Sequence, residues 1–481
     1  MLKETAWKWI EDNQAQLTKI CDDIWGFAEY GLCEDKSSRL IAETLGKHGF
    51  KIKLGVAGMP TALTAEWGSG KPTIGVMGEY DALPGISNKV VPYKEALVEG
   101  GMGHGCGHNI HGTSAISAAI ASRYALEKHG YGGTIRFYGC PAEENYGGKT
   151  YMVRAALFED VDACLSHHPG SINTARLCSN TATNGVRFHF YGKTAHAAAN
   201  PEQGRSALDA VELMNIGVNY LREHIIEKAR IHYIIEAGGG QPNVVPDYAR
   251  SWYYIRAPER DQLASISKRV EKIAEGAALM TETNLKIESS GMGYNKITSK
   301  TLSELVVHNM REVGPPKYSE KEQEFAAEIA KTFSKQQKID SLKQLKLPEW
   351  EKYIDINLPP DILDAWDDGE VSPGSTDVST VSWVVPTMEF GTVCNVLGAP
   401  GHSWQFVACS GSTIGHKSLI FASKTMAGSV LDLMTTPQLI AKAKEEHKKR
   451  LAGKIYEPGD LERKPPLELA RETAEKLKGK V

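Results

Sequence analysis

The stretch "GTIRFYGCPAEE", residues 133–144, decides the fold. Its first part predicts a strand that runs into a loop marked by Pro141, and Glu143 and Glu144 follow directly. In open parallel sheets, ligands bind outside the carboxyl ends of the strands. Two acidic residues at a strand end therefore suggest a site there, provided that neighbouring strands end in the same way.

Neighbouring segments repeat this pattern. The apolar runs "PTIGVMGEY" (72–80) and "VDACLSHHPG" (161–170) predict two more strands. Between the first of them and residue 133, "TSAISAAIASRYALEKHG" (113–130) has one apolar face and predicts a helix ended by Gly130. A further strand is expected at 391–397. Alternating strands and helices are typical of an α/β domain with a mostly parallel sheet flanked by helices.

The pattern changes between residues 184 and 293. The segment "GVRFHFYG" (185–192) alternates apolar and polar residues and predicts a half-buried strand. A helix, two strands, a helix and a strand are then expected at 204–224, 231–237, 248–257, 259–280 and 284–290. This β-α-β-β-α-β order is the ferredoxin-like arrangement. We therefore expect residues 184–293 to form an inserted α+β domain within an α/β domain made of 1–183 and 294–481.

Composition narrows the class of protein. The chain has 481 residues and a net charge of −4, which provides no basic footprint for nucleic acid. No apolar run reaches the ~18 residues of a membrane span. The start, "MLKETAWKWIEDNQAQLTKI", predicts an amphipathic helix and is unlike a signal peptide. The eight cysteines show no disulfide-framework spacing and we find no export signal, so we expect a cytoplasmic protein with no nucleic-acid or membrane partner.

Metal-competent side chains cluster at the ends of the predicted strands. Cys106 and His108 are spaced C-x-H in "GMGHGCGHNIHGTS" (101–114), which alone is more typical of a glycine-rich loop with incidental histidines. Three further clusters each follow a predicted strand: Glu143-Glu144, His167-His168, and His402 in "GAPGHSWQF". Thiolate and imidazole ligands suit zinc and similar metals. Four clusters at one sheet edge therefore predict a metal site.

The paired glutamates suggest hydrolytic chemistry. One carboxylate can bind a metal while its neighbour accepts a proton from a water whose pKa the metal lowers toward ~7. The alternative is an exposed acidic turn. Asp81, in "GEYDALPG" (78–85), also follows a strand on this edge. It could orient a histidine ligand or cap the following turn, and the sequence leaves both open.

Three residues of the inserted domain are weaker candidates. His196 ends a strand in "GKTAHAAANP", Asn243 lies in the loop "GGGQPNVVP", and Arg256 ends the strand "SWYYIR". A guanidinium fork and a side-chain amide suit a substrate carboxylate. A purely structural role is the stronger expectation for each residue on this evidence.

These segments, in this order, resemble the M20 metallopeptidase family, and within it the amidohydrolase branch, where a cysteine enters the metal set. The matching segments are "HGCGHNIHG", "PAEE", "SHHPG", "GKTAHAAANP", "NVVP", "GSTD" and "GHSWQF". The resemblance implies two metal ions, zinc or manganese, held by Cys106, His108, Glu144, His168 and His402. We prefer His168 over His167 because this branch keeps a histidine directly before the proline. Asn109 stands where the family often has an acid.

The resemblance also implies roles for the remaining candidates. Glu143 would be the general base, and Asn243 and Arg256 would hold the substrate's carboxylate. His196 would reach across a homodimer into the partner's site and steady the oxyanion. The inserted domain would then serve as lid and dimerisation domain.

The activity implied by the resemblance is hydrolysis of the amide bond of N-acyl amino acids. The expected leaving group is glutamate or aspartate, and the acyl side is aromatic, such as p-aminobenzoyl or indole-3-acetyl. Two alternatives stay open. The chain could be a dipeptidase or aminoacylase of the same family, or a partner subunit with little activity alone in a heteromer with a related subunit.

Overall fold

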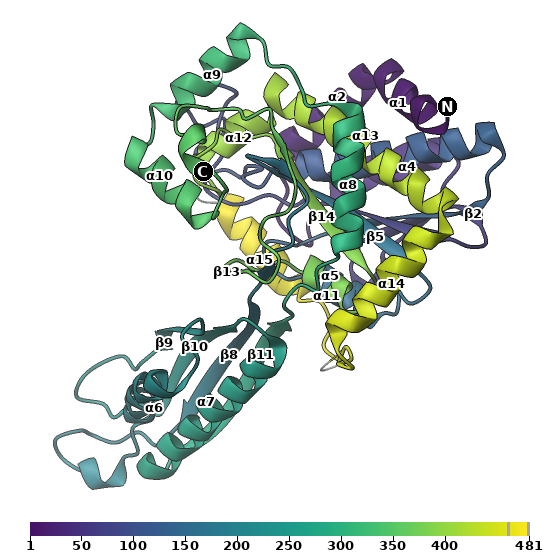
Figure 1. The fold of residues 1–481 in the computed structure, drawn as a ribbon. Helices are drawn as coiled ribbons and strands as arrows, with labels where there is room; N and C mark the ends of the chain where they lie inside the picture. The colour runs from purple at the N-terminus through teal and green to yellow at the C-terminus, as the bar shows by residue number, and fades with distance from the viewer. Residues whose placement is uncertain (459–461, 479–481) are drawn as a thin grey trace. The chain divides into compact units, whose positions relative to one another are not determined.

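The computed structural model describes residues 1–458 and 462–478, which divide into two compact units (Figure 1). The first unit comprises residues 1–178, 297–370 and the described residues from 380 on. The second unit comprises residues 179–296 and 371–379. The short segment 371–379 joins the second unit because β13 (Val371–Ser372) pairs in parallel with β7 (Ser179–Asn180).

The first unit is built on an eight-stranded sheet. The strand order is β1 (Lys51–Leu54), β2 (Leu63–Ser69), β4 (Gly133–Cys140), β3 (Thr73–Glu79), β5 (Ala163–Gly170), β14 (Thr387–Val393), β6 (Asn173–Thr174) and β12 (Ile362–Leu363). The four central strands β4, β3, β5 and β14 are mutually parallel. Their carboxyl ends therefore share one edge, which confirms the predicted α/β class.

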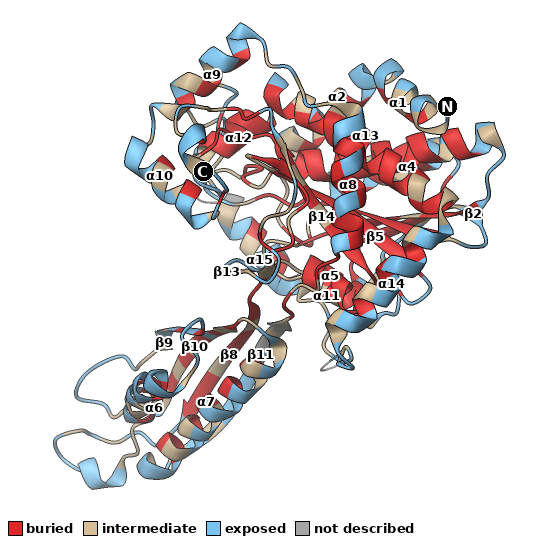
Figure 2. Cartoon of the chain, viewed as in Figure 1, coloured by how far each residue is buried: buried red, intermediate tan, exposed pale blue. Residues whose placement is uncertain are grey.

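Helices cover this sheet and bury its apolar face. The long α4 (His108–His129) and α13 (Thr413–Thr435) pack together, with α1 (Leu2–Asp12) and α8 (Lys300–Val313) beside them. Buried residues concentrate in these helices and in the sheet (Figure 2). Further helices of this unit include α2 (Gln14–Phe27), α3 (Asp35–Lys47), α5 (Gly148–Arg154), α12 (Trp404–Ser410), α14 (Pro437–Leu451) and α15 (Leu467–Lys478). The division between the two units falls within α11 (Val378–Ser382).

Two elements differ from their predicted positions. The strand expected at 391–397 is β14 (Thr387–Val393), because its pairing with β5 runs from Thr387 to Val393 and the chain then turns. The backbone N–H groups of Cys394 and Asn395 both bond the carbonyl of Gly170, which ends the strand. The helix expected at 113–130 begins five residues earlier, at His108, so that residue lies in the first turn of α4.

The second unit has the predicted ferredoxin-like order. Its elements are β8 (Ala182–Tyr191), α6 (Ala207–Leu221), β9 (Arg230–Ala237), β10 (Tyr248–Ala257), α7 (Arg260–Thr281) and β11 (Asn284–Gly293). The strands form an antiparallel sheet in the order β11-β8-β10-β9, with β9 at one edge. Val186, Phe188 and Phe190 lie in its core, as the alternation in 185–192 predicts.

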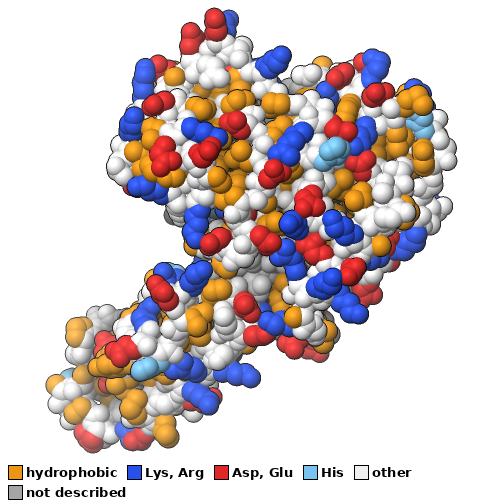
Figure 3. Space-filling view, in the orientation of Figure 1, with side chains coloured by type: hydrophobic (Ala, Val, Ile, Leu, Met, Phe, Trp, Pro, Cys, Tyr) orange, Lys and Arg blue, Asp and Glu red, His pale blue; other side chains and the backbone are white. Residues whose placement is uncertain are grey.

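The polar segment 315–362 is part of the first unit and forms α9 (Glu320–Ala330), α10 (Lys335–Gln344) and the short helix η4 (Trp350–Tyr353). It buries Ala326, Ile329 and Leu342, so its inner face is part of the core. Within the described residues, no helix has both the length and the apolar character of a membrane span. Basic and acidic side chains are interspersed over the face drawn in Figure 3.

We predict that the Glu322 carboxylate makes stability depend on pH. It caps α9 by accepting from the Ser319 N–H at 2.6 Å, and it lies 2.5 Å from Lys417 Nζ. Burial alone would raise the pKa of Glu322, but Lys417 and Ser319 outweigh it and hold the pKa at about 2. The pKa of Glu in an unfolded chain is about 4.3, so the carboxylate stabilises the folded state fully above that pH. This stabilisation is lost as the pH falls toward about 2.

Glu322→Gln tests this pH dependence. The variant should be less stable than the wild type near neutral pH, and the difference should shrink as the pH falls below about 4.3. Urea unfolding followed by tryptophan fluorescence measures the difference at each pH. A difference that stays constant down to about pH 3 would contradict the assignment.

Candidate metal centre

The metal candidates converge at the carboxyl edge of the central strands. Cys106 and His108 sit where the chain enters α4, separated by Gly107, whose φ of +69° favours glycine. A Cβ at Gly107 would lie 3.0 Å from side-chain atoms of Pro169 and Phe406, so the loop packs tightly against both. This close approach brings Cys106 near the ends of β5 and α12.

Two groups of three potential ligands share one sulfur. Cys106, His108 and His168 form one group, and Cys106, Glu144 and His402 form the other. In each group the ligand atoms lie within 4.8 Å of one another. A thiolate, imidazoles and a carboxylate are the donors that zinc and similar divalent ions prefer. The five residues therefore fit a pair of ions with Cys106 common to both.

The adjacent histidines have different surroundings. His167 is buried, with Nδ1 3.0 Å from Ser114 Oγ and Nε2 2.8 Å from Thr392 Oγ1, so both ring nitrogens have partners. Burial also lowers the pKa of His167 well below its usual range. His168 uses only Nδ1 in this way, 3.0 Å from the Pro169 carbonyl oxygen. This geometry favours His168 as the ligand.

Asp81 contacts two of the predicted ligands. Its Oδ1 lies 2.9 Å from Nδ1 of His108, and its Oδ2 accepts a hydrogen bond from the backbone N–H of Glu144 at 3.0 Å. A carboxylate on Nδ1 fixes the ring so that Nε2 is the ligand atom. Of the two roles left open by the sequence, the orienting role matches this geometry.

His402 lies on the exposed side of the cluster. Its side chain is 58% exposed, and Nε2 lies 3.5 Å from Glu144 Oε2. The backbone has a φ of +51°, and its N–H bonds the carbonyl of Gly105 at 3.3 Å. Ser403 then caps α12 by accepting from the Phe406 N–H. The loop 398–403 therefore brings this predicted ligand close to the loop that carries Cys106.

A buried ion pair lies beneath the ligands and was not predicted from the sequence. Glu79 Oε1 lies 2.5 Å from Lys149 Nζ, while Oε2 lies 3.1 Å from His108 Nε2 and 3.4 Å from His111 Nε2. Burial alone would raise the pKa of Glu79, but His111, Lys149 and His108 outweigh it and lower the pKa. Glu79 does end a predicted strand, which was a usable signal. No sequence signal pointed to Lys149, because lysine is seldom fully buried.

Acidic groups dominate the electrostatics of the centre. Burial and the carboxylates of Glu144 and Glu143 raise the pKa of the Cys106 thiol well above its usual range. Burial alone would lower the pKa of His108, but Glu79 and Asp81 outweigh it and raise the pKa. This excess of negative charge is what divalent cations would neutralise, and it favours a metal-binding role for the cluster.

The other three candidates belong to the second unit. His196 Nδ1 accepts from the N–H groups of Ala198 and Ala199 at 3.2 and 3.1 Å, so Nε2 carries the proton of the neutral ring. Asn243 lies on the neighbouring loop, and its backbone carbonyl accepts a hydrogen bond from the Ala197 N–H. Arg256 donates to the Pro373 carbonyl at 3.4 Å, next to the "GSTD" segment.

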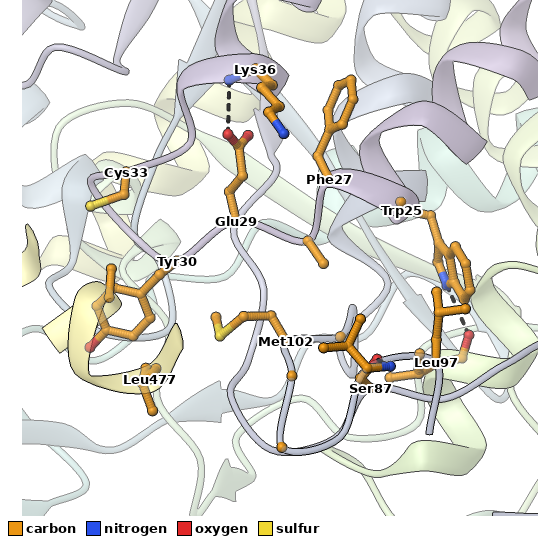
Figure 4. Close-up of a pocket in the computed structure, with 18 of the residues that line it drawn as sticks. Trp25, Phe27, Glu29, Tyr30, Cys33, Lys36, Ser87, Leu97, Met102 and Leu477 are labelled. Atoms are coloured by element: carbon orange, nitrogen blue, oxygen red, sulfur yellow. Dashed lines mark hydrogen bonds between the residues drawn. The ribbon is translucent and has the colours of Figure 1, made fainter. Parts of the chain in front are cut away.

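A cavity of about 620 Å³ lies in the first unit (Figure 4). Its walls include Trp25, Phe27, Tyr30 and Leu477, and the segment 100–103 that precedes the metal-binding loop. Two contacts drawn in the figure hold the walls in place. The Trp25 indole N–H donates to the Val407 carbonyl, and the Glu29 carboxylate accepts from the Lys36 N–H. The described residues that line this cavity include none of the five predicted ligands.

Comparison with known proteins agrees with this fold and centre. Residues 75–347 match the model of peptidase family M20/M25/M40. The chain is 40% identical to a p-aminobenzoyl-glutamate hydrolase subunit of Escherichia coli K12, over 91% of this chain and 93% of that protein. It is 31% identical to the mouse Xaa-Arg dipeptidase, over 82% and 79% of the two chains.

A solved structure supports the same fold. A dinuclear metal-binding M20 peptidase from Bacillus subtilis superposes with a TM-score of 0.56 at 17% identity, covering 89% of this chain and 99% of that one. The chain therefore belongs to the M20 peptidase family, and it is a hydrolase. Its sequence motifs indicate the same relationship to hydrolases of the aminobenzoyl-glutamate type.

We predict that alanine substitutions separate the two adjacent histidines. His168→Ala should lose bound metal, because it removes a ligand from the group that contains Cys106 and His108. His167→Ala should keep the wild-type metal content but unfold at lower temperature, because Ser114 and Thr392 lose a buried partner worth about 1–3 kcal/mol. Elemental analysis after dialysis and thermal unfolding measure both effects. Metal loss in His167→Ala alone would reverse the ligand assignment.

Proposed function

We propose that this chain hydrolyses the amide bond of N-acyl amino acids with an aromatic acyl group, using two zinc or manganese ions. The observation that carries the proposal is the pair of ligand groups that share Cys106, with Glu143 directly before the ligand Glu144. The 40% identical relative, a p-aminobenzoyl-glutamate hydrolase subunit, supports this substrate class. Indole-3-acetyl-aspartate is the second substrate that we propose to test.

The proposed mechanism assigns each residue a distinct task. Cys106, His108 and His168 would hold one ion, and Cys106, Glu144 and His402 the other. Bound divalent ions polarise a carbonyl group and lower the pKa of water. Glu143 would take the proton of the attacking water on its carboxylate and deliver it to the leaving amine.

The second unit would bind the substrate's amino-acid part. The Asn243 amide and the Arg256 guanidinium are suited to its carboxylate. His196 has its Nδ1 occupied by two backbone N–H groups, so its Nε2–H is available to steady the oxyanion. We infer that His196 does so in the partner subunit's site.

We further propose that the second unit is a lid that also dimerises. β9 is an edge strand and exposes Ile234 and Ile235, and α6 exposes Ile216 and Tyr220. Exposed edge strands with apolar residues tend to pair with another chain. A homodimer is the simplest use of this surface, and a heteromer with a related subunit is the alternative.

A cytoplasmic location fits the proposal. All eight cysteines lie among the described residues, and none of them forms a disulfide. Reduced cysteines are typical of proteins in a reducing compartment.

A dipeptidase activity is the second candidate, because the 31% identical mouse relative is an Xaa-Arg dipeptidase. A substrate panel decides between the two. The purified chain, loaded with zinc or manganese, is assayed on p-aminobenzoyl-glutamate, indole-3-acetyl-aspartate and dipeptides. Higher kcat/KM on dipeptides would favour the second candidate. Activity that appears only after a related subunit is added would favour the partner-subunit interpretation.

Replacing the proposed base should abolish turnover without removing the metal. We predict that Glu143→Gln lowers kcat by about 10²- to 10⁴-fold, because an amide cannot accept the proton. Metal content should stay at the wild-type level, since Glu143 is outside both groups that share Cys106. Glu143 also lies in a group with Glu79 and His108, but Glu79 already has Lys149 as its counterion. Steady-state kinetics and elemental analysis on the same sample test both points. Near wild-type kcat in this variant would refute the assignment.

Co-expression of two inactive variants tests whether His196 acts across the dimer. Glu143→Gln and His196→Ala should each be nearly inactive alone. In a hybrid dimer, the His196→Ala chain keeps its base and receives His196 from its partner, so one of the two sites is complete. With random pairing, about a quarter of wild-type activity should return. If the mixture stays inactive, His196 does not act in trans.

A further inference from the structure

The turn that carries Glu143 and Glu144 is held by buried carboxylates on both sides. Glu34 Oε1 accepts a hydrogen bond from the Ala142 N–H at 2.8 Å. Asp81 Oδ2 accepts from the Glu144 N–H at 3.0 Å. The two carboxylates therefore fix the backbone immediately before and after Glu143.

This turn needs such support because its backbone is strained. Ala142 has a φ of +58°, in the left-handed region, which costs a residue with a Cβ about 1–2 kcal/mol. Its carbonyl accepts from the N–H groups of Tyr146 and Gly147, which closes the turn. A Cβ on Gly148 would lie 2.0 Å from the Pro141 carbonyl oxygen, so α5 begins directly against the turn.

Glu34 is itself firmly held. It is fully buried, and its Oε2 accepts from the Thr61 hydroxyl at 2.8 Å. Three residues earlier, a Cβ on Gly31 would lie 2.9 Å from the Ala142 side chain, so the segment 31–34 packs closely on the turn. Burial, with a contribution from Asp81, raises the pKa of Glu34 to about 8. A glutamine would keep one acceptor oxygen for the Ala142 N–H, and its NH₂ group can donate to the Thr61 hydroxyl oxygen.

We propose that Glu34 is a positioning residue that sets the placement of both the base Glu143 and the ligand Glu144 through the Ala142 N–H. The proposal builds on the function proposed above, since it assumes those two roles. Glu34 acts through the backbone and belongs to neither group of potential metal ligands that shares Cys106. A small displacement of a catalytic group can cost about 10²-fold in rate, which sets the scale of the expected effect.

Three variants and one matched control test the proposal. Glu34→Ala removes the acceptor of the Ala142 N–H, whereas Glu34→Gln keeps one acceptor oxygen and an NH₂ group for Thr61. The matched control is Glu322→Ala, which removes a buried carboxylate that caps α9. Thr61→Val is a milder variant that loosens Glu34 without removing it, and it serves if Glu34→Ala does not fold.

Three measurements distinguish positioning from general loss of stability. Glu34→Ala should lower kcat by about 30- to 100-fold with KM changed by less than about threefold. Titration with Mn²⁺, followed by electron paramagnetic resonance, should show one of two sites weakened by about tenfold or more, because Glu144 is displaced. Amide exchange of residues 140–147 in the metal-free protein should accelerate. Thr61→Val should change all three in the same direction by a smaller factor.

Glu34→Gln and Glu322→Ala should resemble the wild type in all three measurements. Wild-type kcat, Mn²⁺ affinity and exchange in Glu34→Ala would overturn the proposal, as would equal damage in Glu34→Gln and Glu34→Ala. If the wild type hydrolyses none of the amides, the proposed function fails. The Mn²⁺ titration and the amide exchange then still decide the role of Glu34.

Discussion

The Asp81 carboxylate joins the two parts of the chain on which the centre depends. One oxygen contacts the ring of His108 at the start of α4, and the other accepts from the backbone of Glu144 after β4. Because Asp81 follows β3, which pairs in parallel with β4, a single short side chain spans neighbouring strand ends. The relative placement of these two proposed ligands is therefore determined by the sheet and not by flexible loops.

The buried carboxylates near Asp81 are neutralised by different kinds of positive charge. Glu79 lies deeper than the ligands and has the buried ammonium of Lys149 as its counterion. Since that cation is part of the chain, we infer that Glu79 is balanced before any metal binds. The carboxylates of Glu143 and Glu144, by contrast, lie nearer the Cys106 thiol, where incoming ions would supply the positive charge.

The sequence predicts most of the fold because its periodicities are strong. The alternation in 185–192 and the order of elements after it predict the ferredoxin-like unit. The positions of the strand ends predict which side chains come together as candidate ligands. The register of β14 was harder to predict, because 386–398 is largely apolar and only pairing with β5 selects Thr387–Val393. Contacts between distant buried polar residues, such as Glu34 with Ala142, leave no periodic signal.

The main segment of the second unit, residues 179–296, begins and ends at neighbouring points of one sheet. Thr183 near the start of β8 pairs with Gly293 at the end of β11, so the entry and exit of the chain are adjacent. Insertions whose ends are close are well tolerated by the host domain. Within an evolving family, such a module can be exchanged or reshaped for a new substrate while the strand ends that carry the proposed ligands are inherited unchanged. Substrate range and hydrolytic chemistry could then diverge at separate rates.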